Sequence, residues 1–368
     1  MLSLLLIGLA PLLIFFHLGI APRPQPATVL VRPPRQAIKA IYLTAHTAGL
    51  KSRREELVRL VEATELNAMV IDLKDYSGRV FFASGVPLAD ATGAQDLKVA
   101  PDLPQFVGEL KRRGIYAIAR LAVFQDPHLA EARTDLALHK KSGVGLWRDH
   151  KGLAWVDTSL REVWDYNLDL MAAAVRLGFD EINLDYIRFA SDGNLRDIRS
   201  AGYEDGVSKT EIMRRFFAYA GERFAYLPVR TSVDLFGLTL WQDNGLGIGQ
   251  RFEDAAPYFD AIAPMVYPSH YADGFEGFAN PAEHPYEVVG RSLARGRPGL
   301  VGTRAEFRPW LQDFDLGADY TADKIRAQIQ ATYDEGSEGW MLWNASNRYT
   351  EAALLTDPSA AVGSAAPR

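Results

Sequence analysis

The chain contains no cysteine among its 368 residues. Catalysis by a thiol, disulfide cross-links and thiolate metal sites are therefore excluded. The chain also lacks a strong excess of charge of either sign, because 40 Lys and Arg residues stand against 46 Asp and Glu residues, a formal net charge of −6. This small and mixed charge argues against nucleic acid as a partner.

Long apolar runs are also scarce, and the one that stands out is LSLLLIGLAPLLIFFHLGI at residues 2–20. It is only just long enough to span a bilayer as a helix. A cleaved signal peptide is the alternative, but no Ala-x-Ala site follows and no basic region precedes the run. We favour an uncleaved signal-anchor at residues 1–20. In either case we expect the rest of the chain to lie outside the cytoplasm, anchored to the membrane or exported.

Composition divides the remainder into three parts. Residues 21–37 carry five prolines and are typical of an extended linker. Residues 351–368 are rich in Ala, Ser and Pro, and we expect a flexible tail. No Pro- or Gly-rich stretch between these parts resembles a domain boundary. Residues 38–350 are therefore predicted to form one domain.

Within this domain, short apolar runs alternate with amphipathic segments. The runs that predict strands are 40–43, 68–73, 116–123, 181–184, 230–235, 261–266, 307–312 and 340–343. The main segments that predict helices are 52–64, 102–113, 159–177, 209–226, 285–294 and 322–335. Eight strands, each followed by a helix or a long loop, predict an α/β fold of the (β/α)8 TIM-barrel type. A doubly wound open sheet is the alternative, although its usual Gly-rich turn after the first strand is replaced here by TAHTAG at 44–49.

Polar side chains gather where the expected strands end. The carboxyl ends of barrel strands meet at one face, so these side chains are predicted to share one site. The candidates are His46, Asp72, Lys74, Arg120, Asp185, Tyr186, Arg188, Asp234, Tyr267, Gln312 and Trp343.

This mixture of residue types suits the hydrolysis of a carbohydrate. Glycoside hydrolysis needs two carboxyl groups, one to protonate the leaving oxygen and one to attack the sugar or activate water. Asp72, Asp185 and Asp234 are the candidate carboxyl groups. The aromatic side chains would stack on sugar rings, and the Arg, Lys, Gln and His side chains would bond to hydroxyl groups.

The charged residues also suit roles that do not involve acid catalysis. Asp72 with Lys74, or Asp185 with Arg188, would form structural ion pairs at the barrel rim. Three aspartates could hold a divalent cation for the hydrolysis of a carbohydrate ester. We rank that below acid catalysis. His46 and His270 are expected to be loop residues and not metal ligands, because no His-x-x-x-His spacing is present. We therefore expect neither a metal nor a cofactor.

Several segments together resemble a bacterial family classed with the glycoside hydrolases, the domain of unknown function 4015 group. The segments that carry the resemblance are 39–46 (KAIYLTAH), 70–78, 179–189 (FDEINLDYIRF), 248–250, 263–268, 308–312 and 339–344 (GWMLWN). They span the whole predicted barrel. The resemblance implies a TIM barrel with glycosidase activity on a carbohydrate substrate.

The fourth strand also looks like that of the family 18 chitinases, whose pattern is Asp-Gly-x-Asp-x-Asp-x-Glu. Asp180, Asn183 and Asp185 take its three aspartate positions, but Ile187 stands where the acid glutamate belongs. The α-amylase-like barrels offer the better analogy, and this analogy is one of fold. It implies Asp185 as nucleophile or general base and Asp234 as general acid, with Asp72 tuning or replacing one of them. The missing glutamate also leaves open a barrel that binds glycans at the cell surface without catalysis.

Overall fold

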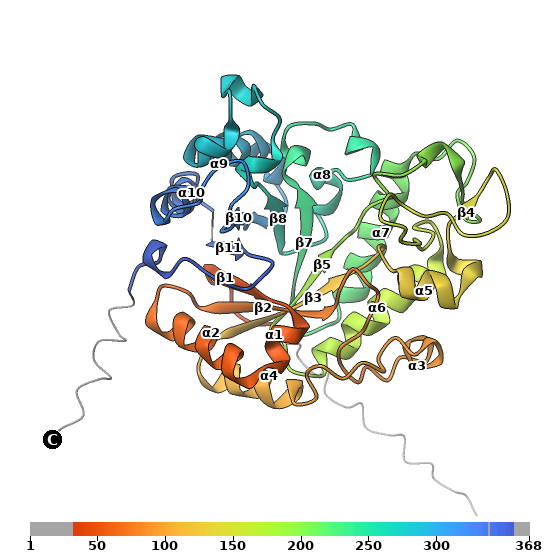
Figure 1. Ribbon diagram of the computed structural model, residues 1–368, viewed down its shortest axis with the longest axis horizontal. Helices are drawn as coiled ribbons and strands as arrows, with labels where there is room; N and C mark the ends of the chain where they lie inside the picture. The colour runs from red at the N-terminus through yellow and green to blue at the C-terminus, as the bar shows by residue number, and fades with distance from the viewer. Residues whose placement is uncertain (1–31, 338, 357–368) are drawn as a thin grey trace, which may run out of the picture. The chain divides into compact units, whose positions relative to one another are not determined.

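The computed structural model describes residues 32–337 and 339–356. Parallel strands are hydrogen-bonded in the order β10-β11-β1-β2-β3-β5-β7-β8-β9, and pairing of β10 with β8 closes the ring (Figure 1). The strands are β1 (Ile38–Leu43), β2 (Ala68–Lys74), β3 (Tyr116–Ala122), β5 (Glu181–Asp185), β7 (Arg230–Phe236), β8 (Ala261–Met265), β9 (Glu306–Phe307), β10 (Trp310–Gln312) and β11 (Gly339–Trp343). The predicted barrel is confirmed, and the open sheet is excluded because the ring is closed.

The seventh strand of the barrel is interrupted. β9 and β10 are two short pieces separated by Arg308 and Pro309, so the nine strands fill eight positions around the ring. Proline has no N–H to donate to a strand ladder, which accounts for a break at this point. The predicted strand at 307–312 therefore exists in two parts.

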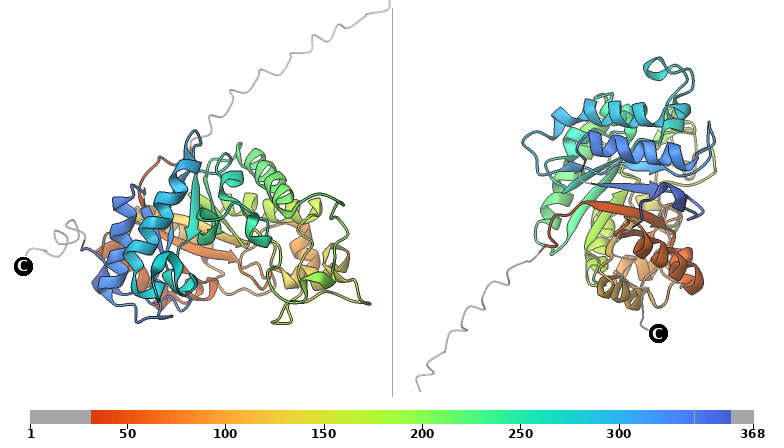
Figure 2. Two further views of the ribbon diagram at one scale, coloured as in Figure 1. Left: turned by 90° about the horizontal axis from the view of Figure 1, so that it is seen from above. Right: turned by 90° about the vertical axis from the view of Figure 1, so that its left-hand side faces the viewer.

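Helices surround the barrel on its outside (Figures 1 and 2). They are α2 (Lys51–Ala63), α4 (Leu103–Arg112), α6 (Arg161–Val175), α7 (Lys209–Phe224), α8 (Phe252–Ala255), α9 (Pro285–Gly296) and α10 (Ala322–Asp334). The short helices α1 (Ala45–Gly49), α3 (Pro87–Thr92) and α5 (Pro127–Ala132) lie in the loops. The six predicted helices are all present, with ends that differ from the expected ones by two residues at most.

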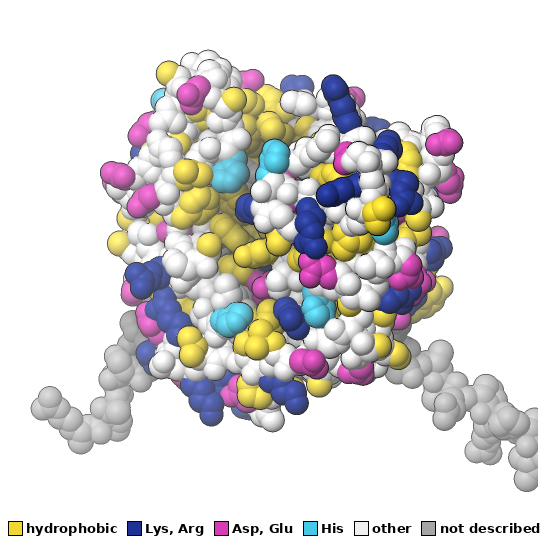
Figure 3. Space-filling model, turned by 45° about the vertical axis from the view of Figure 1, so that its right-hand side comes forward, with side chains coloured by type: hydrophobic (Ala, Val, Ile, Leu, Met, Phe, Trp, Pro, Cys, Tyr) yellow, Lys and Arg dark blue, Asp and Glu magenta, His cyan; other side chains and the backbone are white. Residues whose placement is uncertain are grey.

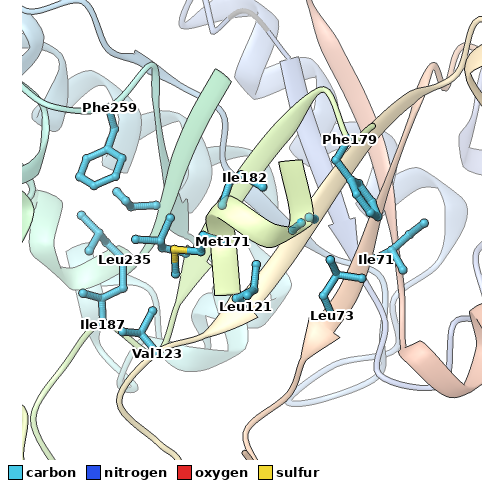
Figure 4. Close-up of a cluster of buried hydrophobic side chains, with 14 of the residues drawn as sticks. Ile71, Leu73, Leu121, Val123, Met171, Phe179, Ile182, Ile187, Leu235 and Phe259 are labelled. Carbon is cyan, nitrogen blue, oxygen red and sulfur yellow. The ribbon is translucent and has the colours of Figure 1, made fainter. Parts of the chain in front are cut away.

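Side chains alternate between the inside and the outside of the barrel, as the period of a strand requires. On β2, Val70 belongs to the cluster inside the barrel, whereas Ile71 and Leu73 belong to the large cluster between strands and helices. Figure 4 shows this outer cluster, in which Met171 of α6 lies among side chains such as Leu121 from the strands. The outward-facing side chains of the strands therefore build the main core. The inward-facing side chains near the carboxyl ends of the strands are available to form the site.

The long loop between β3 and β5 contains the short helix α5. Further along it, β4 (His139–Lys140) pairs with β6 (Ile198–Arg199), which lies in the loop after β5. Two tryptophans of this loop, Trp147 and Trp155, are buried in a small apolar cluster with Ala190. The loops that follow the third and fourth barrel strands thus pack together.

The expected signal-anchor at residues 1–20 and the part of the linker before Arg32 lie outside the described residues, as do residues 357–368, so these expectations stay predictions. Among the described helices, none combines the length and apolar character that crossing a bilayer requires. Residues 351–356, where the tail was expected to begin, form the turn η9 (Glu351–Ala353) and a bridge from Thr356 to Thr64.

An ion pair fills the amino-terminal end of the barrel interior. Glu181, 2% exposed, accepts hydrogen bonds from the guanidinium of Arg308 at 2.5 and 3.1 Å. Ser232 and Tyr116 donate to the same carboxylate at 2.5 and 3.2 Å. A buried ion pair is stable only when its remaining polar atoms are bonded in this way. The pair joins the fourth and seventh barrel strands across the interior.

We expect Glu181→Gln to lower the free energy of unfolding by about 3–5 kcal/mol, because the variant leaves a buried guanidinium without its carboxylate. Urea unfolding would measure the change. Glu62→Gln is the matched control, since Glu62 pairs with Arg113 at the surface with a side chain 42% exposed. The control should change the free energy by less than about 1 kcal/mol. Equal effects of the two substitutions would contradict the argument.

Candidate functional site

A guanidinium surrounded by three carboxylates lies inside the barrel near the carboxyl ends of the strands. Arg120 of β3 is 4% exposed. Its Nη1 donates to Asp72 Oδ1 at 2.5 Å, its Nη2 donates to Asp185, and its Nε lies 3.7 Å from Asp234 Oδ2. The sheet register accounts for the first contact, because Asp72 of β2 lies directly beside Arg120. Neither ion pair expected at the rim forms, since Arg120 is the partner of both aspartates.

Aromatic rings enclose the same guanidinium. Its central carbon lies 5.3 Å from the ring centre of Tyr42 and 5.2 Å from that of Trp343. These two rings stack on each other with their centres 4.1 Å apart. The hydroxyl of Tyr42 donates to Asp72. Arg120 therefore has little freedom to move, and it holds Asp72 and Asp185 in fixed positions.

Asp234 of β7 has a different environment from Asp185. It is 1% exposed, and its Oδ1 accepts hydrogen bonds from Asn183 Nδ2 at 2.8 Å and from Trp310 Nε1 at 2.7 Å. Both donors are neutral. Burial, followed by the negative charge of Asp185, raises the pKa of Asp234 to about 8. At neutral pH this carboxyl group therefore carries a proton, whereas Asp185 is bonded directly to a cation.

Both carboxyl groups face one cavity of about 400 Å³, within the usual range for a small-molecule site. Asp185 and Asp234 supply all the carboxylates of its described lining. The other lining residues are Arg120, Tyr186, Arg188, Phe236, Gly237, Leu238, Gln250, Met265, Tyr267, His270, Tyr271, Trp310 and Trp343. Figure 3 looks onto a hollowed face of the molecule, where hydrophobic side chains gather in the hollow and histidines lie near it.

A second, more open cavity of about 710 Å³ adjoins the first. The two share Tyr267, His270 and Trp343 in their walls. The loops after β10 and β11 supply the rest of the second cavity, which includes Asp315, Arg348 and aromatic rings. Trp343, Tyr267 and His270 therefore form part of the wall of both cavities.

The turn after Asp185 is strained. Tyr186 has a φ of 53°, which is uncommon for a residue with a side chain. Its N–H donates to Asp185 Oδ1 at 2.5 Å. Gln250 supports the turn from below, because it donates to the carbonyl of Ile187 at 3.1 Å and accepts from the N–H of Phe236 at 3.0 Å. The strain directs Tyr186 and Arg188 to the cavity wall.

Seven of the eleven expected site residues line the first cavity, and Asp72 contacts it through Arg120. The seven are Arg120, Asp185, Tyr186, Arg188, Asp234, Tyr267 and Trp343. Three expected substrate-binding residues, His46, Lys74 and Gln312, do not line it. Ile187, which stands at the position of the chitinase glutamate, is fully buried in the outer cluster near Val123 and Leu235 (Figure 4).

Lys74 is the clearest correction. The register of β2 shifts between Asp72 and Lys74, so that Lys74 lies beside the outward-facing Leu121. This bulge turns the side chain away from the barrel interior. Its ammonium group is fully buried, 2.9 Å from Asp126 Oδ2, and it donates to Asn167 Oδ1 at 3.0 Å.

The other two residues also lie away from the first cavity, Gln312 at the end of β10 and His46 on α1. Gln312 is fully buried, accepts from the hydroxyl of Ser269 at 2.9 Å and donates to the carbonyl of Phe314 at 2.9 Å. The side-chain amide of Gln312 thus joins the loop after β8 to the loop after β10. His46 lies exposed on α1, where its ring contacts that of Phe81.

Three residues of the site are absent from the candidates that the sequence indicates. Tyr42 and Trp310 lie in expected strands without an expected role, and Asn183 enters only through the chitinase pattern. Asn183 precedes Asp185 by two positions, so strand alternation places both inside the barrel. Applied to every strand, the same rule would also have found Tyr42 and Trp310.

Among the described residues, no group of three or more His, Asp or Glu is arranged to hold a metal ion. The space between the three aspartates is occupied by the guanidinium of Arg120. A cation cannot take that position while the arginine is present.

Comparison with known proteins gives a family match over residues 40–349, to a family described as "Putative glycosyl hydrolase domain". The match covers the barrel from β1 to the loop after β11. None of the curated proteins compared with the chain matches it.

Solved structures also resemble the chain. The glycoside hydrolase domain of PgaB (BpsB) from Bordetella bronchiseptica is 14% identical, with a TM-score of 0.61 over 85% of this chain and 95% of that one. An α-galactosidase from Thermus thermophilus is 14% identical, with a TM-score of 0.52 over 91% of this chain and 62% of that one. A hypothetical protein from Ruminiclostridium thermocellum is 34% identical, with a TM-score of 0.48 over 53% of this chain and 96% of that one. The first two share the barrel fold.

We expect Arg120→Gln to lower the free energy of unfolding by about 3–5 kcal/mol at neutral pH, because it leaves buried carboxylates without their cation. Burial already holds the pKa of Asp72 above its usual value, and the loss of Arg120 raises this pKa further. A carboxyl group with a raised pKa binds its proton more tightly in the folded state. The deficit should therefore shrink as the pH falls through the raised pKa towards about 4.

Urea unfolding at several pH values would test this. Arg113→Gln is the matched control, because Arg113 also contacts three carboxylates, those of Glu55, Glu62 and Glu109, but with a side chain 32% exposed. The control should change the free energy by less than about 1 kcal/mol. A deficit for Arg120→Gln that does not depend on pH would contradict the prediction.

Proposed function

The chain belongs to the family of glycosyl hydrolase domains matched over residues 40–349, and on this premise we propose that it cleaves the glycosidic bonds of an oligo- or polysaccharide by carboxyl acid–base catalysis at the carboxyl ends of the barrel strands. One observation carries the proposal. Asp185 and Asp234 lie on adjacent strands, face the same cavity, and have environments that favour opposite protonation states. A glycosidase needs such a pair.

Each carboxyl group has a role that follows from its partners. Asp234 holds the proton at neutral pH, so it is the general acid that protonates the leaving glycosidic oxygen. Asp185 is bonded to the guanidinium of Arg120 and is the partner of this acid, so it either attacks the anomeric carbon or takes a proton from an attacking water. Asp72 does not line the cavity and is a positioning residue, because it holds Arg120 against Asp185.

The walls of the cavity suit a sugar chain. Trp343 and Tyr267 offer aromatic surface to pyranose rings, and Arg188 and Tyr186 offer polar groups to substituents. Because Trp343 and Tyr267 also line the second cavity, a chain of several sugars can pass from one cavity to the other. This continuity supports an oligo- or polysaccharide rather than a monosaccharide glycoside.

A barrel that binds glycans without cleaving them is the second candidate. The observation in its favour is the direct ion pair between Asp185 and Arg120, which makes the carboxylate a weaker nucleophile or base. A buried isoleucine at position 187 also leaves this strand with a single carboxyl group in the site. The two candidates predict the same ligands and differ only in turnover.

Asp185→Asn should remove turnover of any responsive glycan and leave its binding within a few-fold of the original protein, because the amide keeps the shape but cannot act as nucleophile or base. A glycan screen of the full chain would find the substrate, and calorimetry would measure binding. Asp165→Asn, a change at the outer surface on α6, is the control and should retain turnover. If Asp185→Asn turns over normally, the assignment is wrong; if the unaltered protein binds glycans but cleaves none, the second candidate is correct.

The rate should fall above about pH 8, because only protonated Asp234 can donate and its pKa lies near 8. Asp234→Asn should lower kcat/KM by about 10²-fold or more on natural glycans. It should have a much smaller effect on aryl glycosides whose leaving group needs no proton, and the alkaline fall should vanish there. An alkaline fall that persists in Asp234→Asn would assign the proton to another group.

A further inference from the structure

Arg188 is a buried cation without an anionic partner. It is 9% exposed, lies three residues after Asp185, and lines the first cavity. No Asp or Glu of the described residues lies within 4.0 Å of its guanidinium, whereas Arg120 and Arg308, the other arginines inside the barrel, each contact carboxylates. Burial lowers the pKa of Arg188, and the negative charges of Asp185, Asp192 and Asp149 offset this effect only in part.

The carboxyl groups near the cavity bond to groups other than Arg188. Asp72 and Asp185 both bond to Arg120, and Asp234 is protonated at neutral pH. Burial also lowers the pKa of His270, which favours the neutral ring. Arg188 therefore has no carboxylate in direct contact, and the more distant Asp185, Asp192 and Asp149 offset only part of the cost of burying its charge.

The unused edge of Arg188 has the geometry of a carboxylate receptor. Its Nη1 donates to the carbonyl of Phe189 at 3.2 Å and to Ser191 Oγ at 3.1 Å. Its Nε and Nη2 bond to no described residue, and neither is among the polar atoms sealed from solvent. In the same chain, Arg133 and Arg214 use this Nε–Nη2 edge to hold a carboxylate by two hydrogen bonds of 2.6–2.8 Å.

Aromatic rings hold Arg188 in place. The central carbon of the guanidinium lies 4.9 Å from the ring centre of Trp155 and 5.6 Å from those of Tyr186 and Phe236. Trp155 is in turn fixed by a hydrogen bond from its Nε1 to Asp149 at 3.0 Å. The free edge is thus oriented before any ligand arrives, which reduces the entropy lost on binding.

We propose that Arg188 recognises an anionic group on the glycan, and that this group is the carboxylate of a uronic acid residue. The inference rests on the proposed function, because it assumes that a glycan fills the cavity. Two parallel N–H donors match the two oxygens of a carboxylate. A sulfate or phosphate ester on a sugar offers the same negative oxygens, and experiment separates these sources.

The test compares the binding of matched oligosaccharides to the full chain by calorimetry. The probes are oligomers of a panel of hexuronic acids, the same oligomers with each carboxyl group reduced to an alcohol, and the reduced oligomers carrying sulfate or phosphate esters. We expect one uronate oligomer to bind at least about 10-fold more tightly than its reduced form. Arg188→Gln should remove that preference. Arg161→Gln should keep it, because Arg161 packs against Trp164 and Tyr219 outside the barrel.

The outcomes are distinct. A preference for uronate that depends on Arg188 supports the proposal, and a preference only for sulfate or phosphate esters overturns the choice of carboxylate. Equal binding of all forms, or a preference that survives in Arg188→Gln, overturns the role of Arg188.

Turnover of the same probes is scored separately. Cleavage of neutral oligomers without charge preference would reject this inference and leave the glycosidase assignment intact. Binding that depends on Arg188 without cleavage of any probe would support this inference and reject the glycosidase assignment.

Discussion

The guanidinium of Arg120 is the constraint on which the rest of the site depends. Three strands bring Asp72, Asp185 and Asp234 into the barrel interior, where the negative charges of Asp72 and Asp185 would repel each other without a cation between them. Arg120 makes this arrangement possible because its planar group reaches all three at once. A lysine has one charged atom in place of three and could not form these contacts together. The stacked rings of Tyr42 and Trp343 then fix the plane of the guanidinium. The ion network and the aromatic wall of the cavity are therefore one structure.

The same arginine produces an unequal pair of acids. Its Nη2 bonds directly to Asp185, but only its Nε approaches Asp234, at 3.7 Å. Asp234 is instead satisfied by the neutral donors Asn183 and Trp310, which cannot offset a full negative charge in a buried place. Two residues of one type, on neighbouring strands, thus acquire different proton affinities from geometry alone. A glycosidase requires this difference, and the barrel supplies it without a residue that is intrinsically a better acid.

Strand periodicity was sufficient to predict the barrel, because eight apolar runs of the right length leave few other folds. It also placed Asp72, Arg120, Asp185 and Asp234 together at the strand ends. The partners of these residues could not be predicted, since they depend on register between strands far apart in sequence. The bulge after Asp72 is an example: simple alternation would put Lys74 inside the barrel, and one shifted position puts it outside beside Asp126. Gln312 was misplaced because its side-chain amide bonds to Ser269 and Phe314 in the loops beside the end of β10, which strand alternation does not reveal.

The two arginines of the cavity carry the same charge but act in different ways. Arg120 is balanced by carboxylates of the protein, so its charge is used to build the site. Arg188 has aromatic neighbours and hydrogen bonds on one side only, so its charge remains available. An anionic sugar placed near Asp185 would meet repulsion from that carboxylate, and Arg188, three residues further along the chain, offsets it. A substrate carboxylate bound there would also draw the sugar towards the wall that holds Asp185. In our proposal, Arg188 thus selects the sugar by its charge, whereas Asp185 and Asp234 act on the glycosidic bond.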